Sequence, residues 1–323
     1  MAIKTRLTEM LDIEHPVMLA GMGGVSYARL VAAVSEAGGM GTLGASTMSN
    51  EELPAEMAEV RSLTSKPFGV DLLTALPNQV EQGIASVISG GARVFVAGLG
   101  VPREVIDHLH ANNVLVGSMC GKVRHAVSAV ASGVDFVVAQ GTEGGGHTGT
   151  VATIALIPQV VDAVGDKVPV VAAGGLFDGR GLAASLALGA DGVWIGTRFI
   201  ATPEARAVKG YKETLIGLAE DGTVISRAYT GKTCRVVRTE WTNHYEKHPE
   251  ELQPFPMQAV ASMKAGVNHL GAADGTEVDV AQEFMPAGQG VGAFTSLVPA
   301  TQIVADMVAE AERTMERIAA VRR

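Results

Sequence analysis

The chain has few aromatic residues, few cysteines and little charge. Aromatic side chains make up 4% of its 323 residues, charged side chains make up 18%, and cysteine occurs only at Cys120 and Cys234. The charged fraction is too small for a disordered polyelectrolyte. Because the two cysteines have neither metal-binding nor CxxC spacing, we expect reduced thiols in a cytoplasmic protein. The net charge of −9 argues against nucleic acid as the main partner, since phosphate backbones are bound by basic faces.

The sequence also lacks an apolar segment suited to targeting or to a membrane. No apolar stretch follows the charged residues of the segment 1–6, so we expect no signal peptide. The longest uncharged run covers residues 284–305, but it contains Pro286, Pro299 and several glycines. We therefore expect no membrane span.

Glycine is abundant, with 39 residues, but it shows no Gly-X-Y period, which excludes a collagen-like chain. Instead, glycine ends most of eight short apolar runs, at residues 16–21, 40–44, 68–73, 94–98, 114–117, 136–141, 170–175 and 192–196. Each run is too short for a helix and apolar throughout. This pattern is typical of a parallel strand that is buried on both faces.

Amphipathic, alanine-rich segments separate the runs and predict helices. They cover residues 27–37, 50–62, 78–89, 103–111, 122–132, 158–164 and 179–188, and a closing helix is expected at 299–321. Repeated strand–helix alternation predicts an α/β fold of the (β/α)8 TIM-barrel type. A doubly wound sheet is the alternative, but it usually has fewer strands.

After the eighth run, the composition changes. Residues 201–283 hold most of the Tyr, Trp, Lys and Glu residues that the first half lacks. This change predicts a mostly helical subdomain, inserted after strand eight over residues 201–284. The barrel would then comprise residues 1–200 and 285–323.

Two loops that follow the seventh and eighth predicted strands are candidates for phosphate binding. They read Ala173-Gly174-Gly175 and Ile195-Gly196-Thr197. In TIM barrels the loops after these two strands often hold a phosphate, and glycine lets backbone N–H groups approach its oxygens. Thr197 adds a hydroxyl donor. Tight turns without a ligand are the alternative.

A third loop, residues 140–149, follows the sixth predicted strand and contains three successive glycines before His147. An imidazole has an ordinary pKa of about 6.5, which suits proton transfer near neutral pH. The glycines would let a flat ligand lie against the backbone. Position alone leaves a surface histidine on a flexible loop equally open.

Other residues at the same ends of the strands are weaker candidates. The turn that contains Gly21 and Met22 follows the first run, and Asp71 is a carboxylate inside an apolar run. We expect Asp71 to face a ligand or a buried partner. Cys120 follows the fifth run, but no base neighbours it in the sequence, so we expect a passive thiol.

Together these motifs resemble the nitronate monooxygenase family, formerly called 2-nitropropane dioxygenases, along nearly the whole chain. The most specific pieces are residues 140–149, residues 172–175 followed by Asp178-Gly179, and residues 188–192 followed by 196–199. The same superfamily includes flavin-dependent enoyl-acyl-carrier-protein reductases and NADH:quinone reductases. The resemblance implies a TIM barrel that holds FMN non-covalently beneath an added helical domain.

The resemblance also implies roles for individual residues. His147 matches a histidine of the family that is regarded as a catalytic base. In the family, this base removes a proton from nitroalkanes. The residues that it implies around FMN, including those at the flavin ring and at the phosphate, are Ala20, Gly21, Met22, Asp71, Gln140, Gly145, Gly146, Ala173, Gly174, Gly175, Gly196, Thr197 and Gln289. No metal site is expected.

Three positions depart from the family pattern. Asp71 stands where asparagine is frequent, and a negative charge there would disfavour an anionic reduced flavin. Met119 stands where some relatives have a lysine near the cofactor, and Gly144 replaces an alanine. These departures concern the substrate and the redox tuning more than FMN itself.

Two enzymatic functions follow from the resemblance. The first is a nitronate monooxygenase that oxidises alkyl nitronates with O2 to a carbonyl compound and nitrite. The second is an NAD(P)H-dependent flavin reductase of an enoyl thioester, a quinone or another conjugated carbonyl. In the second function, cations of the insertion would bind a nucleotide or CoA phosphate; they are Lys209, Lys212, Arg227, Arg235 and Arg238. The alternative is that these cations only form a solvated face.

Two alternatives to a flavin enzyme, and one possible assembly, also have to be considered. A barrel like inosine monophosphate dehydrogenase would need a cysteine in the loop that holds His147, and that loop has none. A binding module without catalysis is a further alternative, and a homodimer is possible.

Overall fold

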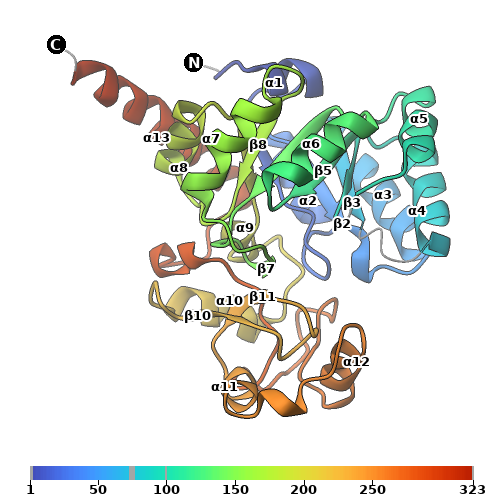
Figure 1. The fold of residues 1–323 in the computed structure, drawn as a ribbon, viewed down its shortest axis with the longest axis vertical. Coiled ribbons are helices and arrows are strands. Elements are labelled where there is room, and N and C mark those ends of the chain that lie inside the picture. Colours follow the sequence, from blue (N-terminus) through green and yellow to red (C-terminus); the bar gives the residue numbers. More distant parts are fainter. Residues whose placement is uncertain (1–2, 73–76, 99, 322–323) are drawn as a thin grey trace.

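The computed structural model describes residues 3–72, 77–98 and 100–321, and its centre is an eight-stranded parallel sheet (Figure 1). The strands are β1 (Val17–Leu19), β2 (Gly41–Gly44), β3 (Phe68–Leu72), β4 (Val94–Ala97), β5 (Leu115–Cys120), β6 (Phe136–Gln140), β8 (Val170–Ala173) and β9 (Gly192–Ile195). Each lies within or beside one of the eight predicted runs. Leu73, the end of the third run, lies outside the described residues.

The sheet curves into a nearly closed barrel. Its strand order is β1-β9-β8-β6-β5-β4-β3-β2, and a parallel bridge between Met18 and Met40 joins the two edges. The backbone N–H groups of Leu19 and Met40 donate across this seam at 2.9 Å each. Nearly all strand residues are buried, because helices cover the outer face and side chains fill the interior. The predicted TIM barrel is confirmed.

Helices lie between the strands around the barrel. They are α2 (Ala28–Glu36), α3 (Glu52–Leu63), α4 (Pro77–Ser89), α5 (Arg103–Ala111), α6 (Val123–Ser132), α7 (Thr153–Val164), α8 (Gly179–Ala187), the short α9 (Thr197–Ile200) and the closing α13 (Ala300–Ala320). Helix α7 begins five residues before the predicted start at Pro158. The carboxylate of Glu143 caps it, accepting from the backbone N–H of Thr153 at 2.8 Å.

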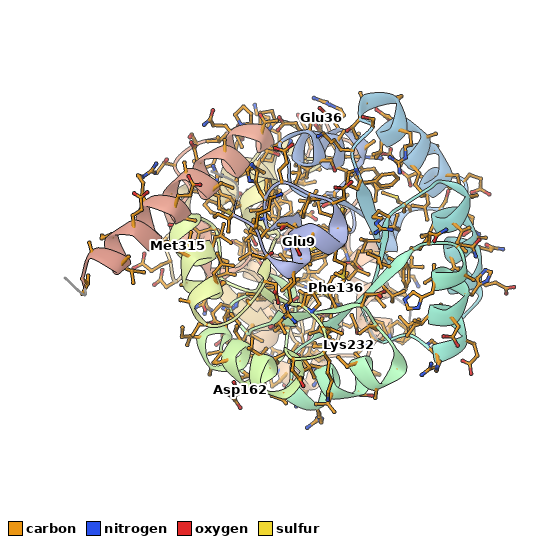
Figure 2. All side chains as sticks on the ribbon, turned by 90° about the horizontal axis from the view of Figure 1, so that it is seen from above. Glu9, Glu36, Phe136, Asp162, Lys232 and Met315 are labelled. Carbon is orange, nitrogen blue, oxygen red and sulfur yellow. The ribbon has the colours of Figure 1, made fainter. Side chains whose placement is uncertain are left out.

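Helix α1 (Arg6–Leu11), which the sequence reading did not identify, covers the amino-terminal end of the barrel. Seen from above, Glu9 of this helix lies at the centre of the ring of helices (Figure 2). Leu7 and Leu11 are buried in the interior cluster that contains Phe136. This end of the barrel is therefore closed, and a ligand must enter at the opposite end.

The segment after α9 forms a separate layer below the barrel (Figure 1). It contains α10 (Lys209–Gly217), β10 (Thr223–Ser226), β11 (Cys234–Val237), α11 (Glu240–Lys247), η2 (Pro249–Glu251) and α12 (Met257–Lys264). Strands β10 and β11 were not predicted. They form an antiparallel sheet with β7 (Gly146–His147), which belongs to the barrel loop after β6.

Aromatic packing holds this inserted segment together. Tyr229 is buried, and its ring stacks on Phe284 at 4.7 Å and on Trp241 at 6.3 Å between centroids. The chain returns to the barrel through η3 (Gln289–Ala293). None of the helices in the described ranges is long and apolar enough to cross a membrane.

Candidate functional site

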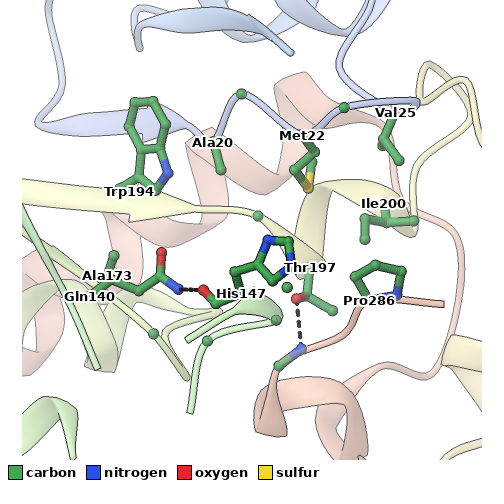
Figure 3. Close-up of a pocket in the computed structure, with 18 of the residues that line it drawn as sticks. Ala20, Met22, Val25, Gln140, His147, Ala173, Trp194, Thr197, Ile200 and Pro286 are labelled. Carbon is green, nitrogen blue, oxygen red and sulfur yellow. Dashed lines mark hydrogen bonds between the residues drawn. The ribbon is translucent and has the colours of Figure 1, made fainter. Parts of the chain in front are cut away.

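A cavity of about 360 Å³ lies between the carboxyl ends of the barrel strands and the inserted segment (Figure 3). Thirteen of the fourteen predicted site residues line it. They are Ala20, Gly21, Met22, Asp71, Gln140, Gly145, Gly146, His147, Ala173, Gly174, Gly175, Gly196 and Thr197. These residues come from five strand ends, so the fold gathers positions that are far apart in the chain.

The predicted phosphate loops meet at one end of the cavity. Gly174 and Gly175 have φ angles of +104° and +71°, which favour glycine. A Cβ atom on Gly174 would lie 2.8 Å from the Thr153 hydroxyl, and one on Gly175 would lie 2.9 Å from the Glu143 Cβ. Both positions therefore require glycine for space as well as for conformation.

The donors at this end fit a phosphate. Within the described part of the chain, the backbone N–H groups of Gly175 and Gly196 donate to no other residue. The Thr197 hydroxyl oxygen accepts from the Gly288 N–H at 3.0 Å, which leaves the hydroxyl proton for an anion. Free N–H groups and a hydroxyl around glycine backbone are the donor set that a phosphate ester requires.

The loop that contains His147 lies between the barrel and the insertion. Its backbone pairs with β11, so that His147 is opposite Cys234 and Gly146 is opposite Arg235. The Gln140 side-chain amide donates to the His147 carbonyl at 3.0 Å, as Figure 3 shows. Gln140 thus supports the histidine from inside the barrel.

The imidazole of His147 borders the cavity, and His147 remains exposed to solvent. Loss of water around the ring lowers the pKa of His147 below its usual value, and the nearby cation of Lys232 lowers the pKa further. Because the usual pKa of about 6.5 is lowered, the neutral ring, which has a lone pair available for a proton, predominates at pH 7. Its Nε2 lies 3.0 Å from the hydroxyl oxygen of Thr230.

Asp71 lies at the end of β3 and lines the cavity next to Gly21. A Cβ atom on Gly21 would lie 2.2 Å from the Asp71 Cβ, so glycine is needed there for the carboxyl to fit. Burial raises the pKa of Asp71 to about 8. The sequence leaves a negative charge possible at this position; with a pKa of about 8, the carboxyl is mainly protonated at pH 7.

Gln289 is the one predicted residue that does not line this cavity. It is exposed, and it lies along a neighbouring groove between α7 and α8. Its backbone N–H donates to the Glu143 carbonyl at 3.0 Å, while its neighbours Gly288 and Gly290 line the main cavity. The contact of Gln289 with a cofactor stays a prediction.

The other wall of the cavity is formed by residues that no sequence motif singled out. This insertion wall consists of Tyr211, Thr230, Cys234, Leu270 and Phe284. Except for Thr230 and the Tyr211 hydroxyl, it is apolar, and that hydroxyl donates to the Pro286 carbonyl. The enrichment of aromatic residues in the insertion was the available signal, but it could not show which side chains face the barrel.

Each of the five predicted phosphate-binding cations has a partner in the protein. Arg235 is buried and donates to the Thr142 carbonyl at 2.9 Å, and Lys212 is buried near the Ala205 carbonyl. Arg227 donates to the Gly231 carbonyl, while Lys209 and Arg238 form ion pairs with Glu213 and Glu246. None of the five lines the main cavity within the described residues.

Cys120 does not line the cavity either. It is buried at the end of β5, and its thiol donates to the Ser118 carbonyl at 3.6 Å. Burial raises the pKa of Cys120 to about 12, so the thiolate is scarce at neutral pH. The structure therefore agrees with a passive thiol.

The nearly closed barrel, with a glycine-lined cavity and a histidine at the carboxyl ends of its strands, defines a class, the TIM-barrel enzymes. The comparisons specify the family. The sequence model described as "Nitronate monooxygenase" matches residues 4–87 and 78–310. The chain belongs to the nitronate monooxygenase family of flavin oxidoreductases.

Three similar proteins illustrate the breadth of this family. A (3aS,4S,5R,7aS)-5-hydroxy-7a-methyl-1-oxo-octahydro-1H-indene-4-carboxyl-CoA dehydrogenase of Mycobacterium tuberculosis is 42% identical over 76% of this chain and 69% of its own length. A probable nitronate monooxygenase of Staphylococcus aureus is 33% identical over 83% of this chain and 88% of its own. The structure of FabK from Thermotoga maritima superposes with a TM-score of 0.90, at 34% identity and 99% coverage of both chains.

Proposed function

We propose that this protein is an FMN-dependent nitronate monooxygenase, which oxidises alkyl nitronates with O2 to a carbonyl compound and nitrite. The observation that carries the proposal is the position of His147, whose imidazole has a lowered pKa and lines the cavity above an apolar barrel interior. The match to the family sequence model supports it.

The cavity fits FMN at its barrel end. Gly174, Gly175, Gly196 and Thr197 would hold the phosphate, and the glycines before His147 would lie along the flat ring. Asp71, as a neutral acid, would offer a hydrogen bond to the ring where an asparagine would otherwise do so. When bound, FMN would supply electron transfer between the nitronate and O2.

His147 would accept the α-proton when the substrate is a neutral nitroalkane. Its lowered pKa keeps the acceptor unprotonated at pH 7, and the Lys232 cation close by favours the anion that proton removal creates. Tyr211, Leu270 and Phe284 of the insertion wall would cover the substrate and exclude water.

The second candidate is an NAD(P)H-dependent reductase or dehydrogenase of a thioester or another conjugated carbonyl. The 42% identity to the CoA-ester dehydrogenase of Mycobacterium tuberculosis favours it. Among the described residues that line the cavity, Asp71 is the only one of a charged type besides His147. The phosphates of CoA or of a nucleotide would therefore remain outside the cavity, and only the apolar part would enter.

Anaerobic mixing distinguishes the two candidates. The purified protein should be yellow and should release FMN when it is denatured. An alkyl nitronate, NADH and NADPH are then added separately in the absence of O2, and the flavin absorbance is followed. We expect bleaching by the nitronate. Bleaching by NADH or NADPH alone would support the second candidate, and a colourless protein that cannot be reconstituted with FMN would contradict both.

The division into a barrel of residues 1–200 and 285–323 and an insertion of residues 201–284 belongs to this proposal. So do a cytoplasmic location and a homodimer. Limited proteolysis, cell fractionation and light scattering test these three points.

A further inference from the structure

The hydroxyl of Thr230 has three hydrogen-bond neighbours that together determine where its proton lies. It lies 3.0 Å from the His147 Nε2, and 3.3 Å from both the backbone N–H and the carbonyl oxygen of Lys232. A hydroxyl has one proton to donate and two lone pairs to accept with.

Only one arrangement satisfies all three contacts. The Lys232 carbonyl can only accept, so it takes the hydroxyl proton. The Lys232 N–H can only donate, so it occupies one lone pair. The second lone pair then faces His147 Nε2, which must therefore carry a proton.

We propose that Thr230 is a positioning residue that holds His147 in its Nε2–H tautomer and leaves Nδ1 as the atom that accepts a proton. No described residue is hydrogen-bonded to Nδ1, and the ring lines the cavity. The assignment rests on the proposed role of His147 as a base and adds which nitrogen acts and which residue selects it.

Thr230 is held firmly enough for this task. It is 6% exposed, and the backbone just before it accepts three side-chain hydrogen bonds. Trp241 and Gln258 donate to the Ala228 carbonyl, and Ser262 donates to the Tyr229 carbonyl at 2.9 Å. The insertion thus fixes the hydroxyl, while β11 and Gln140 fix the histidine backbone.

The charged and titratable groups around His147 do not compete for Nε2. Lys232 acts through its positive charge, Cys234 is the backbone partner across the strand, and Arg235 donates to the Thr142 carbonyl. Glu143 accepts from Thr153. None of these four side chains is hydrogen-bonded to the imidazole within the described residues.

Three variants test the assignment. Thr230→Val removes the hydroxyl but keeps the shape, and Thr230→Ser keeps the hydroxyl. Thr214→Val is the matched control, because the Thr214 hydroxyl bonds within α10 to the Gly210 carbonyl. The measurement is the nitrogen NMR spectrum of holoenzyme labelled with 15N-histidine, in which His147 is assigned by its loss in His147→Gln.

We expect the Nε2–H tautomer in the unchanged protein, in Thr230→Ser and in the control. In Thr230→Val the Nε2–H would lose its protein acceptor, so the fraction of the Nδ1–H form should increase. The kcat/KM for a nitroalkane should fall by roughly 10–100-fold, the range found when the hydrogen-bond partner that orients a metal-bound imidazole is removed. The kcat/KM for the preformed nitronate should change less than about 2-fold, since no proton is removed from it.

An Nδ1–H tautomer in the unchanged protein would overturn the assignment, and so would an unchanged spectrum in Thr230→Val. The proposed function fails separately. If no nitroalkane or nitronate is turned over while the tautomer responds to Thr230 as expected, the enzymatic proposal is wrong and the tautomer assignment stands.

Discussion

The two walls of the cavity are built in different ways. The barrel wall contains backbone at Gly174 and Gly175, where side chains are excluded by space and by φ, and at Gly196, where an added Cβ would lie 3.3 Å from the Met22 sulfur. The insertion wall is made of side chains that long-range contacts hold in place, such as Thr230 and Phe284. In the function proposed above, the barrel would hold the cofactor and the insertion would contact the substrate.

The largest expected effect is on the histidine that joins the two walls. His147→Ala should lower kcat/KM for a nitroalkane by about 10²–10⁴-fold, the usual contribution of a positioned general base. Turnover of a preformed nitronate should fall less than about 10-fold, because that substrate has already lost the proton. Steady-state kinetics on both substrates check this. Equal losses on the two would remove His147 from the role of base and leave it a binding role only.

A glycine of the barrel wall should affect the cofactor instead. Gly175→Ala places a Cβ 2.9 Å from the Glu143 Cβ at a φ of +71°. We expect the Kd for FMN to rise by about 10–100-fold, since a shifted loop misaligns donors worth about 1.5–3 kcal/mol each. Fluorescence titration of the apoprotein with FMN measures it. Gly217→Ala is the control, because nothing lies within 4 Å of its added Cβ. Unchanged FMN affinity would place the phosphate elsewhere.

The contrast between the walls also explains what could be predicted from the sequence. The barrel wall depends on strand ends and glycines, and local periodicity shows both, so the eight strands and the loops at Gly174 and Gly196 could be predicted. The contact of His147 with Thr230 spans 83 residues and depends on the pairing of β7 with β11. No local pattern encodes such a pairing, because β7 is two residues long and sits in a glycine-rich loop.

The charge state of Asp71 could not be predicted from the sequence, for a related reason. A carboxyl group with its ordinary pKa is ionised at pH 7. Only the packed structure shows how far burial removes water from the group and raises its pKa. Gly21 against its Cβ and the enclosed end of β3 provide that desolvation. The residue type was therefore visible in the sequence, whereas its protonation state was a property of the fold.

Asp71 should produce a moderate effect that depends on pH. Its pKa is raised to about 8 in the folded protein, while an unfolded carboxyl has a pKa of about 3.9. Between these values the folded state binds more protons, so stability falls as pH rises from about 4 to 8. Asp71→Asn removes this loss. The Tm of Asp71→Asn minus the Tm of the unchanged protein should increase by about 2–6 °C from pH 5.5 to pH 8. This range allows for partial exposure of the residue. A constant difference in calorimetry across that interval would show that Asp71 titrates normally.

The smallest expected effect on the enzyme concerns its two thiols, one buried in the barrel and one on the insertion wall. Burial raises the pKa values of Cys120 and Cys234 to about 12, so alkylation at pH 8 should be at least about 100-fold slower than in the unfolded chain. Activity should persist until labelling occurs. Cys120 lies in the eight-stranded barrel, whereas Cys234 lies in a three-stranded sheet beside the cavity, so local opening should expose Cys234 first. Mass spectrometry of the alkylated peptides over time measures both rates. Faster labelling of Cys120 would mean that the barrel opens more readily than the insertion.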